Sequence, residues 1–221
     1  MRIRDRLDVS ARRQRQVSRV LQVLLVGVLA VGVWRRDVGV LVNAGIALGV
    51  TFLPGVLERD LEIPMDAGLT LWLTSAVFLH GLGTVGIPGT ELQSFYQSVG
   101  WWDHMTHALS ASVVAGVGYT VVRALDIHTA EIRLPPRFTF VFVILFVLAF
   151  GVVWEVIEFG VTELSTLTGG SPVLTQYGLE DTMLDLCFNT LGGVIVATWG
   201  TAHLTDVVGA VVARLDARRA G

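Results

Sequence analysis

Apolar residues are gathered into six runs along the chain, and polar or charged residues fill the short stretches between them. The runs cover residues 17–34, 38–56, 67–85, 104–125, 138–159 and 181–203. A helix that crosses a bilayer needs about 20 predominantly apolar residues, which is close to the length of each run. The pattern therefore predicts an all-α fold, a polytopic transmembrane bundle of about six helices.

The first run follows basic residues, as a signal peptide would, but it lacks the other features of one. No small-residue cleavage site follows it, and the second run begins after only Arg35, Arg36 and Asp37. We therefore expect an uncleaved helical hairpin. Because most of the remaining connections are also short, neighbouring helices should lie antiparallel.

The apolar pattern resumes after the sixth run, with four valines between residues 207 and 212 ahead of Arg214 and Arg218. This spacing predicts that the last helix continues as an amphipathic segment near the lipid headgroups. We find no repeat or long linker. We therefore expect a single membrane domain, divided as follows: a basic cytoplasmic segment at 1–16, six transmembrane helices within 17–203, and a cytoplasmic-side helix and tail at 204–221.

Composition supports a membrane protein. Of the 221 residues, 52% are hydrophobic and 16% are charged, whereas about a quarter of the residues in a soluble domain are charged. The single cysteine, Cys187, excludes an intramolecular disulfide.

The arginines give the orientation. All 16 basic residues are arginine, and a cytoplasmic N-terminus places 14 of them on the cytoplasmic side, with only Arg35 and Arg36 outside. The reverse orientation would place those 14 outside. We therefore expect a multi-pass protein of the cell (cytoplasmic) membrane with both termini in the cytoplasm.

Polar residues inside the runs are the candidates for function, because a charge at bilayer depth costs about 2.5–3.5 kcal/mol on insertion scales. They form three pairs at spacings of three or four: Asp103 and His107, Glu155 and Glu158, and Asp181 and Asp185. Residues at these spacings share one face of a helix. With the orientation above, all three pairs lie in the outer half of the membrane. His80, alone in the third run, is more typical of a hydrogen-bonded packing residue.

Carboxylates and imidazole on facing helices are the donors of a divalent metal site for Mg²⁺, Mn²⁺, Fe²⁺ or Zn²⁺. Several acidic groups close together would also repel one another without a cation or shared protons. The alternative is that these groups only hydrogen-bond to one another and hold the helices together. We predict a divalent metal ion as cofactor, with the ligands His107, Glu155, Glu158, Asp181 and Asp185, and with Asp103, His104 and Asn189 as additional or supporting residues.

Three segments carry a resemblance to known families: WWDHMTHALSAS at 101–112, WEVIEF at 154–159 and TQYGLEDTMLDLCFNTLGG at 175–193. They resemble the YjdF-like family of prokaryotic inner-membrane proteins, which has these motifs in the same order. The Asp103/His107 and Asp185/Asn189 elements are also distantly similar to VanZ-like proteins. The sequence departs from these families at His104, where they more often have Arg or Lys, and at Glu180, where Trp is expected.

Three functions remain open from the sequence. The first is a metal-dependent enzyme that acts on a lipid or polyprenyl headgroup from the outer side. The second is a transporter or channel that uses the same carboxylates to bind an ion or solute. The third is a structural membrane protein whose polar cluster only holds the bundle together. We expect membrane lipids as partners and no nucleic acid, and the sequence leaves open whether the protein is an enzyme.

Overall fold

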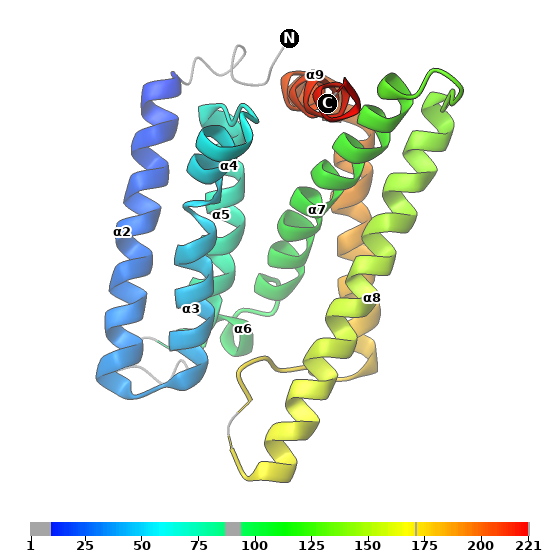
Figure 1. The fold of residues 1–221 in the computed structure, drawn as a ribbon. Coiled ribbons are helices and arrows are strands. Elements are labelled where there is room, and N and C mark those ends of the chain that lie inside the picture. Colours follow the sequence, from blue (N-terminus) through cyan, green and yellow to red (C-terminus); the bar gives the residue numbers. More distant parts are fainter. Residues whose placement is uncertain (1–9, 87–93, 171, 221) are drawn as a thin grey trace.

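The computed structural model describes residues 10–86, 94–170 and 172–220, and this part of the chain consists of helices and their connections (Figure 1). The eight described helices are α2 (Ala11–Arg35), α3 (Val38–Val50), α4 (Leu53–Leu61), α5 (Ala67–Gly83), α6 (Phe95–Ser98), α7 (Trp102–His128), α8 (Pro136–Thr168) and α9 (Leu179–Ala220). The predicted all-α fold is confirmed. Residues 1–9 of the predicted basic segment, and residue 221 of the tail, lie outside the described residues.

Five helical segments are long and apolar enough to cross a membrane: Ala11–Arg35, Val38–Leu61, Trp102–His128, Pro136–Thr168 and Leu179–Gly200. Helix α5, at 17 residues, occupies the place predicted for the third run and is shorter than the other five. Its length is at the lower end of what a bilayer-crossing helix needs. It lies beside α2 and α3 in the bundle (Figure 1).

The predicted hairpin between the first two runs is present as α2 and α3. Helix α2 ends where Arg36 adopts a left-handed conformation, with φ at 55°. Asp37 then caps α3 by accepting a hydrogen bond from Val40 N at 3.0 Å. Because one residue ends the first helix and the next begins the second, the two helices run antiparallel over a very short connection (Figure 1).

The second predicted run, 38–56, is interrupted rather than continuous. Helix α3 ends at Val50 and α4 begins at Leu53, with Pro54 in its first turn. Proline has no backbone N–H and its ring collides with the preceding turn, so the helical segment Val38–Leu61 is broken just before this position. Gln22 of α2 stabilises the break by donating from Nε2 to Thr51 Oγ1 at 3.1 Å.

Helix α8 extends beyond its predicted end, whereas the predicted helical continuation of the last run is confirmed. Helix α8 continues from the predicted end at 159 to Thr168, where Gly169 ends it in a left-handed conformation. Helix α9 continues through Ala220, and its C-terminal part turns across the end of the bundle that also holds the start of α2 (Figure 1). Leu204 and Val208 of this part are buried in the main apolar cluster. Its place relative to the membrane stays a prediction.

The helices form two groups that meet between α5 and α7. Helices α2, α3 and α5 pack around Leu25, Ala44 and Phe78. Helices α7, α8 and α9 pack around a larger cluster that includes Ala115 and Val143, and α5 contributes Leu69 to it. The two groups face each other across a cavity that is lined by residues of both.

Helices α7 and α9 come into close contact at Gly192. A Cβ at this position would overlap the backbone carbonyl oxygen of Ala108 and would lie 3.0 Å from Ser112 N. Only a residue without a side chain permits this contact, which is the way in which membrane helices often pack through small residues. The contact involves Ala108, the residue after His107 on α7, and lies about one turn beyond Asn189 on α9, so it holds both helices close at the candidate site.

We expect Gly192→Ala to destabilise the protein by about 1–3 kcal/mol, because overpacking against a backbone atom forces α7 and α9 apart. Thermal unfolding of the purified protein in detergent measures this effect. Gly209→Ala, on the same helix but with no atom within 4 Å of the added Cβ, is the matched control and should be neutral or slightly stabilising. Equal effects of the two substitutions would contradict the close contact.

Candidate functional site

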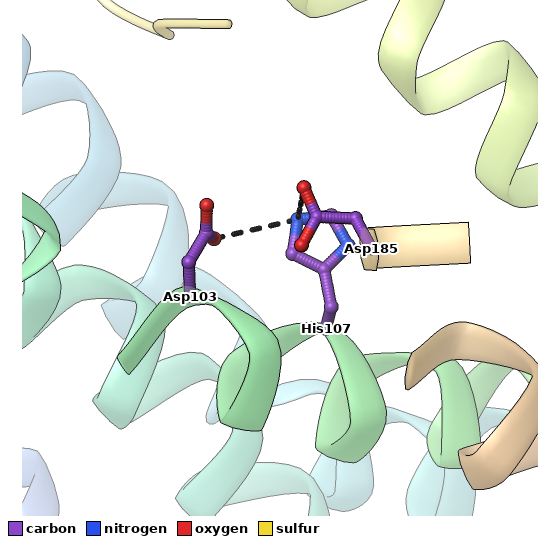
Figure 2. A group of neighbouring side chains, drawn as sticks. All are labelled: Asp103, His107 and Asp185. Atoms are coloured by element: carbon purple, nitrogen blue, oxygen red, sulfur yellow. Dashed lines mark ion pairs between the residues drawn. The ribbon is translucent and has the colours of Figure 1, made fainter. Parts of the chain in front are cut away.

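The three predicted polar pairs belong to the start of α7, the second half of α8 and the start of α9, which lie toward the end of the bundle away from the described chain ends (Figure 1). Asp103 and His107 lie one turn apart at the start of α7. Asp185 faces them from the start of α9, and Figure 2 shows the ion pairs that His107 makes with both carboxylates as dashed lines. The side chain of Asp185 is 1% exposed, so the carboxylate lies inside the protein rather than toward lipid.

His107 is held in one orientation by α9. Its Nδ1 lies 3.3 Å from Asn189 Oδ1, a contact that is a hydrogen bond in the neutral tautomer with its hydrogen on Nδ1. The neutral ring then has its lone pair on Nε2. That nitrogen lies 3.5 Å from Asp103 Oδ1 and 3.8 Å from Asp185 Oδ2. Both distances exceed those of an ordinary N–H···O hydrogen bond.

Glu155 and Glu158 approach His107 from α8. One ligand atom of each of these three residues lies within 4.8 Å of the other two. Glu155 is buried, and its Oε2 accepts a hydrogen bond from Thr182 Oγ1 at 2.8 Å. Thr182 in turn accepts from Gln176 Nε2 at 2.9 Å. Glu155 Oε1 is also buried and has no hydrogen-bond partner among the described residues.

His104 and Asp181 lie at the margin of this cluster. His104 Nδ1 is 3.4 Å from Asp185 Oδ1, and its ring stacks on Phe188 with the centroids 4.8 Å apart. Asp181 Oδ2 accepts a long hydrogen bond, 3.4 Å, from the backbone nitrogen of Tyr177. The two groups of side chains close enough to share an ion include neither residue.

The predicted residues therefore differ in how close they lie to His107. Asp103, predicted as an additional residue, lies as close to His107 as Asp185 does, whereas Asp181, predicted as a ligand, lies further out. The two groups that could hold a divalent ion are Asp103, His107 and Asp185, and His107, Glu155 and Glu158. Whether an ion binds them stays a prediction.

A second polar network lies on the other helix group. His80 of α5 contacts Asn43 Oδ1 through Nε2 at 3.1 Å and the Tyr96 hydroxyl through Nδ1 at 2.9 Å. Asn43 also donates to the carbonyl of Val173 at 2.8 Å, in the connection that precedes α9. Both nitrogens of His80 have partners, so His80 connects α5 to α3 and α6.

The tyrosines near the site keep their protons. Burial raises the pKa of Tyr96, which keeps its hydroxyl as a donor to His80. Burial also raises the pKa of Tyr177, and the nearby carboxylates of Asp103, Asp181 and Glu158 raise it further. Neither phenol therefore adds to the negative charge of the carboxylates.

A cavity of about 770 Å³ connects the two helix groups. Its lining includes the ionisable side chains of Asp103, His107 and Glu158, other polar side chains such as Asp37 and His80, and apolar side chains such as Ile46 and Val147. Its volume is within the range of pockets that bind small molecules and cofactors. The cavity therefore combines ionisable and polar groups with apolar side chains.

Several residues of this region were not predicted from the sequence. Asn43 is the one that the sequence could have revealed. A lone amide in the apolar run 38–56 is as unusual as a charged residue there. Thr182 offered no such signal, since threonine is common in membrane helices. Tyr96 lies between two runs, and only the fold brings it to His80.

We expect Thr182→Val to destabilise the protein by about 1.5–3 kcal/mol, because it removes the hydrogen bond to the buried Glu155 carboxylate while keeping the side-chain volume. Unfolding in detergent measures the loss. Thr198→Val is the matched control on α9, since Thr198 is exposed and donates only to backbone carbonyls of its own helix. A similar loss in both variants would show that the contact with Glu155 contributes nothing of its own.

Comparison with known proteins gives a family for this chain. Residues 17–206 match a family described as "Predicted membrane protein (DUF2238)". The chain is also 30% identical over 141 residues to an uncharacterized protein of Thermotoga maritima, an alignment that covers 64% of this chain and 66% of that protein, just under two thirds of its length. No solved structure matches the chain. Since the match spans five of the long apolar helices and the whole site, the chain belongs to the DUF2238 family of predicted multi-pass membrane proteins.

Proposed function

We propose that this protein is a membrane enzyme that binds a divalent metal ion at His107 and acts on the headgroup of a lipid or polyprenyl substrate. The observation that carries the proposal is the convergence of acceptors on this residue. The lone pair of His107 Nε2 faces Asp103 Oδ1 and Asp185 Oδ2, and ionised carboxylates bring no hydrogen to it. A cation among these three atoms would replace repulsion with coordination.

The spacing of these atoms supports a metal ion. Two ligands about 2.1 Å from one ion lie about 3.4 Å apart in tetrahedral geometry. The distances of 3.5 and 3.8 Å from Nε2 to the Asp103 and Asp185 oxygens are only slightly longer. Asn189 would fix the orientation of the ring, as a hydrogen-bond partner of a metal-binding histidine usually does.

A bound divalent ion would polarise a headgroup oxygen or activate a bound water molecule. The chain's own residues would hold this ion and orient the substrate beside it. The described residues that line the cavity include no arginine. The ion would therefore supply the counter-charge for an anionic headgroup.

The apolar walls of the cavity support a substrate with a hydrocarbon chain. Ile46 of α3, Val114 of α7 and Val147 of α8 line the cavity together with Asp103 and His107. A lipid chain lying against these walls would bring its headgroup to the ion. A water-soluble substrate would gain little from such walls.

A transport function has less support. A solute that crosses the membrane would need polar groups beyond Asn189, toward the end of the bundle that holds the described chain ends. In the described part of the chain, that direction leads into the apolar cluster around Ala115, Val143 and Val196. A purely structural role would leave Glu155 Oε1 buried without a partner.

Within its family, we infer that the chain groups with the YjdF-like proteins and that its likeness to VanZ-like proteins is more distant. The three motifs that carry these resemblances also supply the residues of the site. WWDHMTHALSAS holds Asp103 and His107, WEVIEF holds both glutamates, and the third motif holds Thr182, Asp185 and Asn189. The shared pattern is therefore the pattern of the candidate site.

We propose that both termini are cytoplasmic, that the site lies in the outer half of the cell membrane, and that lipids rather than nucleic acids are the partners. The start of α2, the end of α7, the start of α8 and the end of α9 lie at one end of the bundle (Figure 1). Arg12, Arg123, Arg137 and Arg218 belong to these segments. The positive-inside rule assigns this end to the cytoplasm.

Titration of the purified protein with Mn²⁺ or Zn²⁺ should reveal a binding site that His107→Ala weakens at least about tenfold, because the ring supplies the central ligand. Isothermal titration calorimetry in detergent measures the affinity. His128→Ala removes an imidazole that also pairs with a carboxylate, that of Asp216, at the other end of the bundle. This control should bind as the unchanged protein does. Failure of the unchanged protein to bind either ion would overturn the proposal.

Reporter fusions test the orientation. A fusion after residue 221 should report the cytoplasm, and an insertion after Gly170, between α8 and α9, should report the outside, because one membrane crossing separates the two positions. An external signal from the C-terminal fusion would contradict the orientation.

A further inference from the structure

We propose that the site binds two divalent cations rather than one, the first between Asp103 and Asp185 and the second between Glu155 and Glu158, with His107 between them. This inference rests on the proposed metal-binding function and concerns the number of ions. It follows from the charge of the site, from the geometry of His107 and from one unpartnered oxygen.

The charge of the site favours two ions. Five carboxylates lie near enough to interact electrostatically: Asp103, Glu155, Glu158, Asp181 and Asp185. With all five carboxyl groups ionised, one divalent ion would leave three negative charges uncompensated, whereas two ions would leave one. The described residues lining the cavity offer no arginine to make up the difference. Four-helix proteins that hold two iron or manganese ions use a similar ratio, with four carboxylates and two histidines for two ions.

The geometry of His107 favours the same number. The two groups of candidate ligands share only this residue. Its Nδ1 is engaged with Asn189 Oδ1, so Nε2 is the one nitrogen left to coordinate, and it can serve one ion. An ion bound there with Asp103 and Asp185 would leave Glu155 and Glu158 facing each other without a cation.

Glu155 supplies the independent observation that the second group needs a ligand. Its side chain is only 6% exposed, and it comes within 4.8 Å of ligand atoms on both His107 and Glu158. Thr182 satisfies Oε2, whereas Oε1 is buried with no partner among the described residues. Buried polar atoms are nearly always paired, so this oxygen is placed to bind a cation.

The donors indicate the class of ion. Carboxylate oxygens outnumber imidazole nitrogens in both groups, and oxygen-rich sites suit Mg²⁺ and Mn²⁺ better than they suit softer ions. These ions also keep several water ligands, so two carboxylates with water can hold one of them. Mn²⁺ is therefore the appropriate probe, and its unpaired electrons report whether two ions are close together.

The full chain in detergent should bind two Mn²⁺ ions, counted by equilibrium dialysis and elemental analysis. Electron paramagnetic resonance should show the spin coupling of a neighbouring pair. Asp103→Asn and Glu158→Gln should each reduce the count to one ion and abolish the coupling. Glu163→Gln is the matched control, since this exposed glutamate lies on α8 near Glu158 but outside both groups, and it should leave the count at two.

The number of ions separates this inference from the function on which it rests. A single bound ion in the unchanged protein, lost in His107→Ala, would overturn the two-ion site and leave the proposed function in place. No bound ion would overturn both. Two ions without spin coupling would also overturn the inference, because they would not be neighbours. These readouts on the unchanged protein do not depend on whether the variants fold.

Discussion

Side chains on two helices can form one cluster only if the helix backbones come close, and in this protein α7 and α9 do so where Gly192 lies against the carbonyl of Ala108. A larger residue would hold the helices apart at the level where His107 meets Asn189. The rest of the site depends on this contact, because His107 takes its orientation from α9 and not from its own helix. The positions of Asp185 and Thr182 relative to α8 depend on it in turn.

The surroundings of the site show how the protein meets the cost of burying polar groups where little water is available. On α5, both nitrogens of His80 have partners, and Asn43 uses its amide to hold the connection before α9. The network of His80 is therefore closed. At His107 the acceptors outnumber the donors, because carboxylates converge there without arginine or lysine among the described residues that line the cavity. His80 is therefore typical of a packing residue, whereas His107 is the candidate ligand.

The sequence predicted the helices well because length and apolar content alone decide whether a segment can cross a bilayer. It also identified the polar pairs, since helical spacing places Asp103 and His107 on one face. It could not rank the ligands, because spacing does not give the rotation of one helix about its axis relative to another. For this reason Asp181 was predicted as a metal ligand and Asp103 only as an additional residue, although the structure puts Asp103 nearer to His107. Whether Thr182 of α9 meets Glu155 of α8 depends on the same rotation, so the sequence could not predict this hydrogen bond.

Protons and metal ions are the two kinds of cation that can relieve a cluster of acceptors, and they differ in how many atoms each can serve. A proton joins one donor to one acceptor, so shared protons suit carboxylates that meet in pairs. His107 Nε2 faces Asp103 and Asp185 together, at distances too long for a direct hydrogen bond to either. A proton on any one of these three atoms would leave the third without a partner. A divalent ion accepts several ligands at once and needs more room than a proton, which is the geometry present around this ring. Convergence of three acceptors, more than burial of any one of them, is therefore the observation that supports the proposed metal site over a hydrogen-bonded staple between helices.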